Sequence, residues 1–470
     1  MKKLFITTAI DYTNGVIHIG HAYEKILADS YARYQRKKLG DSNVLFTTGT
    51  DEHGTTSQKA AEKRGLTPLQ HVTEISNLDQ EQIDALNISY TRFIRTTDED
   101  HKAKAEEFFQ KAYAAGDIYK ATYKGFYCEG CEAHKTLSEL DEKGQCPNHP
   151  SRQIQELDEE NYFFKWSKYQ GFLKNLIESN ELEIKPEGKR KEMLAFLESG
   201  LKDITVSRPK YKVSWGIQTP VDSAQVIYVW FDALINYVTE GLPKGFWDED
   251  TEIVHFVGKD IARWHTLLWP AMLKSVGYRL PNKVYVHGFV NLNGRKISKS
   301  LGNIILPTEL VQKYGVDAVR YYLLKQGPIV EDSDISEESL KEVYNSDLAN
   351  GLGNTVARIA KMAEKSGFVF NDLPSIPSDD YPFEKDFRVD LVLAHLKELL
   401  GNLDKHINEN EPWKIEDEEK LKAVLIYEVG EITRIAKLYE PFVPNTSNKI
   451  IAQFSNSHIK AQEGLFPKIK

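Results

Sequence analysis

The chain has little of three features that would each point to a class of protein. It has only 3 cysteines in 470 residues, which excludes a disulfide-built secreted fold and favours a reducing compartment. It has no apolar run near the roughly 18 residues of a membrane helix, and no signal-peptide pattern opens it. Its formal net charge of −9 gives no overall basic footprint for nucleic acid. We therefore expect a cytoplasmic protein that makes no contact with a membrane.

The two commonest phosphate-binding loops are also missing, because neither GxxxxGK[ST] nor GxGxxG occurs. Residues 18–21 read HIGH instead, shortly after the apolar run 4–8. The spacing of apolar residues predicts a helix that starts at about Ile19. A helix start after a strand exposes backbone N–H groups that suit an anion, and His18 and His21 would add side-chain donors. Taken alone, HIGH is equally typical of a satisfied histidine pair at a helix end.

A second short motif, KISKS at residues 296–300, lies within the loop GRKISKS. The loop holds Arg295, Lys296 and Lys299 beside a glycine and two serines. A mobile cationic loop can close on a triphosphate and stabilise charge in the transition state. The alternative is a solvated basic loop. The pairing of HIGH with KISKS favours one active site that handles ATP phosphates from two sides.

All three cysteines lie close together in the sequence. Cys128 and Cys131 form one pair, and Cys146 with His149 forms a second pair shortly after it. Two such pairs joined by a short loop are typical of tetrahedral zinc, and four protein ligands leave no position open for catalysis. His134 is an alternative ligand without the paired spacing. Buried thiols with a surface histidine remain the non-metal interpretation.

The order of strand-like and helical segments predicts an α/β architecture. Strand-like runs alternate with helical stretches over residues 1–117, which indicates a parallel sheet with crossover helices. Two amphipathic helices follow the cysteine-rich segment, and two buried strands are expected at 253–258 and 284–290. After about residue 341 the apolar residues recur every three or four positions, which predicts a helical bundle. A loop rich in Pro, Asp and Ser is expected at 371–382.

Polar residues at expected strand ends are the remaining candidates for a site. Asp51 follows a strand directly, at the sheet edge where open α/β folds bind ligands, and would suit a substrate ammonium group. A helix N-cap is an equally good interpretation of Asp51. Asp232 and the run GKDIARWH at 258–265 occupy similar positions. Trp230, Tyr237 and Trp264 near them are also interpretable as core aromatics.

Taken together, these motifs give the chain a resemblance to a known family. With HIGH, KISKS, a cysteine-rich insert and a helical C-terminal region in this order, it resembles class I aminoacyl-tRNA synthetases. More narrowly, it is similar to the methionyl-tRNA synthetase family from residue 3 to beyond 440. The segments that carry the resemblance are DYTNGVIHIGHAYE, FTTGTDEHG, YVWFDALINY, HFVGKDIARWHTLLWPAML and GRKISKSLGN.

The resemblance implies a Rossmann-like doubly wound parallel sheet and a set of site residues. Catalysis would rest on His18, His21 and Lys299. The positions matching ATP contacts are Gly20, Gly258, Asp260, Lys296 and Lys299. The positions matching methionine contacts are Ile10, Tyr12, Asp51, Trp230, Ala233, Tyr237, Ile261 and His265. Those matching anticodon contacts are Asn354, Arg358 and Trp413.

The resemblance also implies a pairing and two departures in this pocket. Arg208 matches a family arginine that pairs with the aspartate at position 51. Asp11 stands where many members have proline, next to Tyr12, and Leu234 replaces a proline of some members. We expect neither departure to touch a group that does chemistry.

The implied activity is that of a methionine–tRNA ligase. Methionine would be activated with ATP to methionyl-adenylate, with Mg²⁺ on the phosphates, and then passed to the terminal ribose of tRNA(Met) bearing the CAU anticodon. A structural Zn²⁺ would be bound by Cys128, Cys131, Cys146 and His149. The resemblance leaves room for a separate tRNA-binding subunit. The expected domains are catalytic residues 1–117, a zinc-knuckle insert at 118–228, catalytic residues 229–283, a stem-contact region at 284–340, and the anticodon-binding bundle at 341–470.

Three other functions are alternatives to this one. A cysteine-specific synthetase would hold zinc in its amino-acid pocket, but here the ligand candidates lie far in sequence from both motifs. A small nucleotidyltransferase would leave the helical region after 341 without a purpose. A non-catalytic tRNA-binding paralogue would not be expected to keep His18, His21 and Lys299. ATP–pyrophosphate exchange across all twenty amino acids would discriminate among these functions.

Overall fold

The computed structural model divides the chain into two compact units, and each is described by itself. Unit 1 comprises residues 1–17, 35–82 and 89–286, and unit 2 comprises 18–34, 83–88 and 287–470. The described residues are 2–128, 130, 133–135, 137–147, 153–297, 302–371, 381, 383 and 387–469. The expected loop at 371–382 therefore lies almost entirely outside them. The bounds of the five domains expected from the sequence stay predictions.

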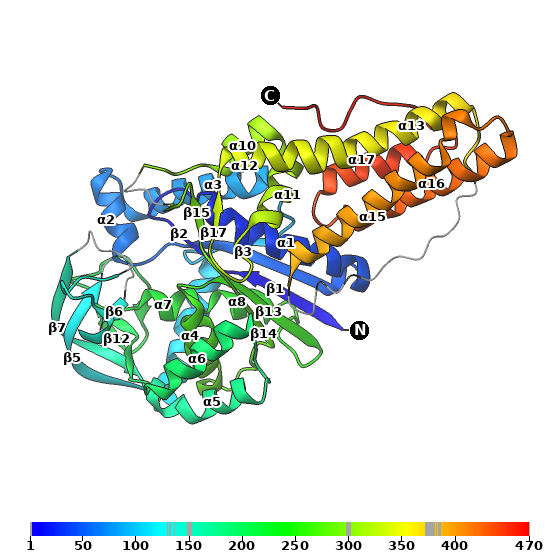
Figure 1. The fold of residues 1–470 in the computed structure, drawn as a ribbon. Coiled ribbons are helices and arrows are strands. Elements are labelled where there is room, and N and C mark those ends of the chain that lie inside the picture. The colour runs from blue at the N-terminus through cyan, green and yellow to red at the C-terminus, as the bar shows by residue number, and fades with distance from the viewer. Residues whose placement is uncertain are drawn as a thin grey trace. The chain divides into compact units, whose positions relative to one another are not determined.

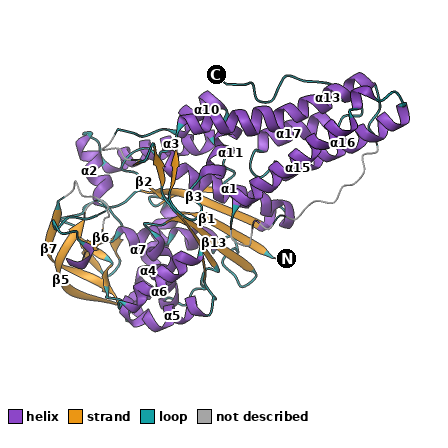
Figure 2. Ribbon diagram, in the orientation of Figure 1, coloured by secondary structure: helices purple, strands orange, loops and turns teal. Residues whose placement is uncertain are grey.

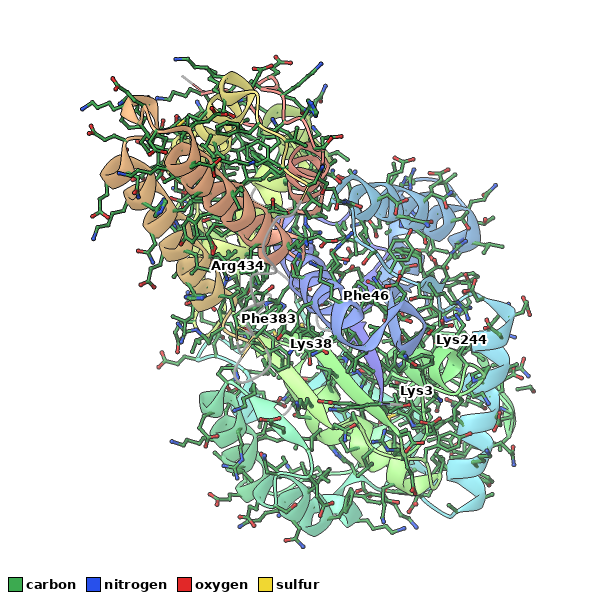
Figure 3. All side chains as sticks on the ribbon, turned by 90° about the vertical axis from the view of Figure 1, so that its right-hand side faces the viewer. Lys3, Lys38, Phe46, Lys244, Phe383 and Arg434 are labelled. Atoms are coloured by element: carbon green, nitrogen blue, oxygen red, sulfur yellow. The ribbon has the colours of Figure 1, made fainter. Side chains whose placement is uncertain are left out.

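Unit 1 is built on a parallel sheet, as expected. Its strand order is β2-β3-β1-β13-β14-β8, with β4 paired to β3 (Figure 1). The pairs β1–β13, β1–β3, β14–β8, β2–β3 and β3–β4 are all parallel. The strands are β1 Lys3–Thr8, β2 Asp11–Tyr12, β3 Val44–Asp51, β4 Arg92–Arg95, β8 Glu183–Lys185, β13 Thr251–Gly258 and β14 Lys283–His287. Every residue of β3 is buried, including Phe46, which Figure 3 labels, and both faces of a parallel strand in such a sheet are covered.

The contact between β3 and β4 depends on a glycine. A Cβ atom at Gly49 would lie 1.8 Å from the carbonyl oxygen of Ile94, so no larger residue fits there. The two strands can therefore approach closely only because position 49 has no side chain. This close approach fixes the direction in which β3 runs to its carboxyl end at Asp51.

Helices surround this sheet, and their packing forms the core of unit 1. They are α2 Thr55–Lys63, α3 Pro68–Ala85, α4 Glu99–Ala114, α5 Gln170–Glu178, α6 Glu187–Glu198, α7 Val229–Ala233, α8 Asn236–Gly241 and α9 Trp269–Ser275. The core is strongly aromatic, with members that include Phe108, Phe109, Phe164, Phe231 and Trp269. The two amphipathic helices expected after the cysteine-rich segment are α5 and α6, so that prediction is confirmed.

The insert in unit 1 is a separate antiparallel layer (Figure 2). Its sheet has the order β6-β5-β7-β9, and a second small sheet has the order β10-β12-β11. The strands are β5 Ile118–Cys128, β6 Ala133–Lys135, β7 Ile154–Phe164, β9 Ile204–Thr205, β10 Ser207–Pro209, β11 Gln218–Thr219 and β12 Asp222–Ile227. Strand β5 ends at Cys128, so the first expected metal ligand lies at the carboxyl end of this strand.

Unit 2 contains the first part of helix α1 (Ile19–Leu39) and everything from residue 287 onward. The expected single strand at 284–290 is wrong, because β14 ends at His287 and β15 begins at Val290. Between them, a Cβ atom at Gly288 would lie 2.6 Å from the carbonyl oxygen of Glu331, so only glycine fits at this point. The small sheet that follows has the order β16-β15-β17, with β15 Val290–Leu292, β16 Arg295–Lys296 and β17 Ser333–Ile335.

A fully buried arginine holds together the centre of unit 2. The guanidinium of Arg320 lies 2.7 Å from Asp29 Oδ2 of α1. It also donates to the backbone carbonyls of Leu86, Pro441 and Phe442 at 3.0–3.1 Å. Because a buried charge is tolerated only when it is paired and hydrogen-bonded, these contacts explain why position 320 can be arginine.

The rest of unit 2 is helical among the residues that the structure describes beyond 341, as expected (Figure 2). Helices α13, α15, α16 and α17 lie alongside one another as a bundle (Figure 1). The helices are α10 Pro307–Tyr314, α11 Val316–Gln326, α12 Glu337–Val343, α13 Asn354–Ser366, α15 Val389–Asn410, α16 Glu418–Tyr439 and α17 Pro444–Phe454. Within the described ranges, no helix is long and apolar enough to cross a membrane.

Candidate active site and its surroundings

Three aromatic residues from separate elements of unit 1 form one wall of the candidate methionine pocket. The ring of Tyr12 in β2 meets Trp230 of α7 edge-on, with centroids 5.9 Å apart. Trp230 in turn stacks on Trp264, with centroids 4.9 Å apart and an interplanar angle of 17°. Trp230 and Trp264 are each 8% exposed. The aromatic residues singled out in the sequence therefore belong to one cluster, and it is buried enough to exclude most water.

A tyrosine–histidine pair adds a polar group to this region. Tyr237 Oη lies 2.8 Å from His265 Nε2, and His265 Nδ1 lies 3.1 Å from the carbonyl oxygen of Ile261. A carbonyl only accepts, so Nδ1 carries the proton and Nε2 accepts from the Tyr237 hydroxyl. The ring of His255 lies 4.5 Å from that of Tyr237. Burial holds the pKa of His255 well below its ordinary value, and His265 lowers it further, so the histidine beneath Tyr237 is neutral.

Asp51 lies at the carboxyl end of β3, as the sequence predicted, and is 3% exposed. The register of β2 and β3 makes Tyr12 and Asp51 direct neighbours on adjacent strands. The carbonyl of Asp51 accepts from the backbone N–H of Thr13 at 3.1 Å, which fixes the turn after β2. A carboxylate beside an aromatic pocket is a suitable arrangement for an amino acid with an apolar side chain.

The remaining candidates for contact with methionine or ATP in unit 1 lie in or next to β2, α7 and β13. Ala233 is the last residue of α7 and is 6% exposed, whereas Ile10 is half-buried just before β2. Gly258 ends β13, and its carbonyl accepts from the N–H of Ile261 at 3.2 Å. Asp260 lies within that turn. The run GKDIARWH thus sits at the carboxyl end of a parallel strand, where the sequence placed it.

The carboxylate that the structure places against Arg208 is Glu159. Arg208 Nε lies 2.7 Å from Glu159 Oε1, and its guanidinium lies 4.4 Å from the centroid of the Tyr127 ring. The N–H is not aligned as a hydrogen bond, so the contact is ionic in character. Lys212 lies 2.9 Å from the other oxygen of Glu159. Burial raises the pKa of Glu159, but these two cations outweigh it and lower that pKa. The pairing of Arg208 with Asp51 stays a prediction.

In unit 2, the HIGH segment has a defined hydrogen-bonded form at the start of α1. The backbone N–H of Gly20 donates to His18 Nδ1 at 3.1 Å, and the backbone N–H of His18 donates to His21 Nδ1 at 3.2 Å. Each Nδ1 therefore accepts, which leaves the proton of each neutral ring on Nε2. The two rings lie 4.0 Å apart. A Cβ atom at Gly20 would lie 3.0 Å from the His18 ring, which explains the glycine.

The KISKS segment begins in a hairpin of the same unit. Asn293 and Gly294 both have positive φ, at 51° and 72°, which is the geometry of the tight turn between β15 and β16. Lys296 is exposed, and its Nζ lies 4.9 Å from the centroid of the Phe289 ring. Asn303 Nδ2 donates to the carbonyl of Lys296 at 3.0 Å. Lys299 lies outside the described residues.

The anticodon candidates lie at the bundle. Asn354 is exposed at the start of α13, one helical turn before Arg358. Arg358 donates to Asp404 Oδ1 at 3.1 Å and to Asn408 Oδ1 at 2.7 Å, both on α15. Trp413 is 53% exposed in a short turn after α15, so the expectation that it is not a core residue is confirmed.

The expected metal site is described only in part. Cys128 and Cys146 are both fully buried, whereas Cys131 and His149 lie outside the described residues. In the portion of the chain that is described, no group of three potential metal ligands occurs. Cys128 belongs to the first expected ligand pair and Cys146 to the second. The burial of both thiols fits a metal site that draws ligands from each pair.

Sequence reasoning missed a buried cluster near Asp51. Asp232 lies between His53 and His101, with its two carboxylate oxygens 2.7 Å from His53 Nδ1 and 2.8 Å from His101 Nε2. The sequence pointed to Asp232 only as another strand-end carboxylate, and the neighbouring sequence DEHG gave one signal for His53. His101 carried no signal, because it is 131 residues away from its partner.

Comparisons with known proteins agree with this architecture. The family model described as tRNA synthetases class I (M) matches residues 4–158 and 151–360. A methionine–tRNA ligase of Caldanaerobacter subterraneus subsp. tengcongensis is 38% identical over 518 residues, covering 100% of this chain and 79% of the relative. One from a Nostoc species is 41% identical, covering 96% and 90%. The Mycobacterium tuberculosis methionyl-tRNA synthetase in complex with methionyl-adenylate matches with a TM-score of 0.90 and 33% identity, over 99% of this chain and 100% of that one.

A parallel sheet of this topology, matched by the class I model over most of the chain, defines a class I tRNA synthetase. Full-length relatives at these identities share one amino-acid specificity, and the chain belongs to the methionine–tRNA ligases. It is a ligase that uses ATP to activate L-methionine and transfers the methionyl group to tRNA.

Proposed function

We propose that the aromatic region of unit 1 is the pocket in which this enzyme binds methionine. The observation that carries the proposal is the register of Tyr12 with Asp51, beside the stacked pair Trp230 and Trp264. Sulfur packs favourably against aromatic rings, and a carboxylate suits the ammonium group of an amino acid. The pocket would be completed by Ile10, Ala233, Tyr237, Ile261 and His265. The related Mycobacterium tuberculosis enzyme is in complex with methionyl-adenylate, which fits a methionine pocket in this fold.

The HIGH segment, in this proposal, contacts the phosphates of ATP. The backbone hydrogen bonds of His18 and His21 leave Nε2–H as the ring donor on each side chain. A donor in a fixed orientation stabilises developing negative charge without reorganising during the reaction. Lys296 and Lys299 would neutralise the outer phosphates, and Gly20, Gly258 and Asp260 would contact the nucleotide. Mg²⁺ would accompany ATP and offset part of the phosphate charge.

The chemistry proposed has two steps. A carboxylate oxygen of methionine attacks the α-phosphorus of ATP, the bond to the bridging oxygen breaks, and pyrophosphate leaves. The 2′-hydroxyl of the terminal tRNA ribose then attacks the methionyl carbonyl, and AMP leaves. In both steps the protein has little covalent work to do, so positioning and charge stabilisation supply most of the acceleration.

The bundle of unit 2 is proposed to recognise the CAU anticodon of tRNA(Met). An exposed indole such as Trp413 offers a plane for an unstacked base, and Asn354 and Arg358 offer groups for base edges. The guanidinium of Arg358 is held by Asp404 and Asn408, which fixes its direction before RNA arrives.

A structural zinc ion is proposed for the insert, held by Cys128, Cys131, Cys146 and His149. The two described thiols are fully buried, as closed zinc sites require. A bound zinc ion would supply folding energy to the end of β5. No step of the reaction depends on it.

ATP–pyrophosphate exchange tests the proposed specificity. The enzyme should exchange label with methionine and with none of the other nineteen amino acids at equal concentration. Trp230→Ala should raise the KM for methionine at least tenfold, because the loss of a large aromatic side chain opens the pocket wall. Leu391→Ala, at an exposed position of α15, is the matched control that should change nothing. Faster exchange with another amino acid, or an unchanged KM in Trp230→Ala, would overturn the proposal.

A further inference from the structure

The buried carboxylate of Asp232 takes no part in the proposed reaction steps, yet it is firmly held in place. Its side chain is fully buried, as is that of His101, and His53 is 4% exposed. Its Oδ2 lies 2.7 Å from His53 Nδ1 and its Oδ1 lies 2.8 Å from His101 Nε2. Because a carboxylate only accepts, both ring nitrogens carry protons toward it. Burial would raise the pKa of Asp232, but the charge and hydrogen bonds of the two imidazoles outweigh this and lower that pKa to about 2.

The three members of the cluster come from three elements, and two of these elements also carry pocket residues. His53 follows Asp51 by two positions at the end of β3. Asp232 lies in α7 between Trp230 and Ala233. Successive helical residues turn by about 100°, so Asp232 and Trp230 point to nearly opposite sides of α7. Fixing Asp232 on one side therefore fixes the direction of Trp230 on the other.

The cluster also reaches α8, which carries Tyr237. The second ring nitrogen of His101, Nδ1, lies 3.3 Å from Thr239 Oγ1. The hydroxyl of Thr239 is 3.0 Å from the carbonyl of Ile235, one turn earlier in the same helix. His101 itself belongs to α4, whose neighbouring residues pack in the aromatic core. One buried network thus joins α4 and the core to the end of β3, to α7 and to α8, three of the places that supply candidate methionine contacts.

Short helices need such anchors. Helix α7 has five residues and α8 has six, and helices of this length are unstable by themselves in water. Neither helix has a side-chain N-cap. Their positions must therefore come from tertiary contacts, and a charged, doubly hydrogen-bonded carboxylate defines a position more narrowly than apolar packing does.

We propose that Asp232, together with His53 and His101, is a positioning cluster that sets the spacing between Asp51 and the aromatic wall and so determines methionine affinity. The inference rests on the proposed methionine pocket. None of the three side chains is assigned contact with substrate. Their effect on the reaction passes through Asp51, Trp230 and Tyr237.

Steady-state ATP–pyrophosphate exchange on the full-length enzyme tests the inference. Asp232→Asn should raise the KM for methionine by about tenfold or more. The amide –NH2 of asparagine donates, so it would face the N–H of one imidazole and that hydrogen bond would be lost. The KM for ATP and kcat should each change by less than about threefold. A purely structural role would lower the melting temperature and leave the KM for methionine unchanged, and that result would overturn the inference.

The histidines provide variants that separate position from folding. An asparagine amide mimics an imidazole Nδ1–H and a glutamine amide mimics Nε2–H, so His53→Asn and His101→Gln keep one donor in place. Both should recover most of the methionine affinity that His53→Ala and His101→Ala lose. Equal KM values for the amide and alanine variants would contradict the proposal, and these variants decide the matter if Asp232→Asn does not fold.

A second buried carboxylate provides the matched control. Glu240 is 1% exposed in α8 and is paired with Arg92 at 3.2 Å and with Lys244, which Figure 3 labels. Glu240→Gln removes a buried charge of similar cost, and we expect it to lower stability while leaving the KM for methionine within about twofold. A wild-type enzyme without methionine-dependent exchange would defeat the proposed function. An active wild type whose cluster variants bind methionine normally would defeat only this inference.

Discussion

The backbone N–H of Ile19 donates a hydrogen bond to the carbonyl oxygen of Ile305 across 3.0 Å. The two residues are far apart in the chain: Ile19 belongs to the HIGH motif, and Ile305 follows the KISKS motif by five residues. This bond ties the first residue of α1 to the segment that follows the cationic loop, within unit 2. The pairing of the motifs in sequence therefore has a direct structural counterpart.

Lys299→Ala should slow adenylate formation by about two to three orders of magnitude and leave methionine affinity nearly unchanged. The ammonium group is proposed to meet negative charge mainly in the transition state, where the loss of one such donor costs about 3–4 kcal/mol. Rapid-quench measurement of pyrophosphate release checks this. Lys313→Ala, at an exposed lysine of α10 in the same unit, is the control. A burst rate equal to that of the wild type would remove Lys299 from the mechanism.

Tyr237→Phe should raise the KM for methionine by about fivefold to tenfold, since one buried hydrogen bond is worth about 1 kcal/mol. The substitution removes the hydroxyl that lies 2.8 Å from His265 Nε2 and keeps the ring. Exchange kinetics at varied methionine concentration measure the change. Tyr169→Phe is the matched control, because Tyr169 donates to Asp117 Oδ2 at 2.6 Å on a different element. That variant should lose stability and keep the KM, and a similar KM effect in both would point to a global defect.

Glu428 of α16 should make the enzyme less stable as the pH rises. Its side chain is fully buried, and burial raises its pKa from 4.5 to about 7 despite the opposing charge of Arg358. His406 Nδ1, 3.4 Å away, is not aligned to hydrogen-bond it. A raised pKa in the folded state means that folding favours the protonated form. Its contribution is therefore fully kept below pH 4.5 and lost as the pH rises through about 7.

The matching experiment compares the wild type with Glu428→Gln. The amide keeps the shape of the protonated acid and cannot ionise, so the variant should gain about 3 kcal/mol relative to the wild type between pH 4.5 and pH 8. Denaturant unfolding at a series of pH values measures this difference. A constant difference across that range would show that Glu428 does not titrate there.

Much of this fold was predictable because it is local in sequence. Strand-like runs rich in β-branched and aromatic residues marked β1 and β3 as strands of a parallel sheet, and residue spacing placed the start of α1 at Ile19. The bundle helices followed from their apolar periodicity. The motifs gave the candidate site residues, which depend on the resemblance rather than on pattern alone.

The parts that could not be predicted are those set by long-range pairing. His53 and Asp232 are separated by 179 residues, and nothing in local periodicity indicates that one will meet the other. Glu428 occupies a helical position where a charged residue reads as solvent-facing, yet it is fully buried. No local pattern linked Arg208 to Glu159, which lies 2.7 Å from its Nε. In each case the packing between elements determines the partner, and the residue type by itself does not predict it.

The insert should bind about one equivalent of zinc per chain. The thiols of Cys128 and Cys146 are both fully buried, and closed zinc sites with ligands of this kind contribute folding energy. Elemental analysis of enzyme purified without added metal would show the ion. Removing it with a chelator should lower the melting temperature and leave the methionine pocket competent once the protein is refolded with zinc. A metal-free chain with an unchanged melting temperature would exclude the site.

Trp413→Ala should weaken aminoacylation of a tRNA bearing the CAU anticodon by about 1–3 kcal/mol, the value of one lost base stack. The indole is 53% exposed beside a bundle whose guanidinium group, on Arg358, is already held in place. Amino-acid activation without tRNA should stay at the wild-type rate, because Trp413 belongs to the bundle and adenylate formation needs no RNA. Leu391→Ala removes an equally exposed apolar side chain, 57% accessible on α15, and should affect neither reaction. Loss of both activities in Trp413→Ala would indicate misfolding. Retention of both would show that anticodon recognition does not use this indole, and would leave Asn354 and Arg358 as the groups to test next.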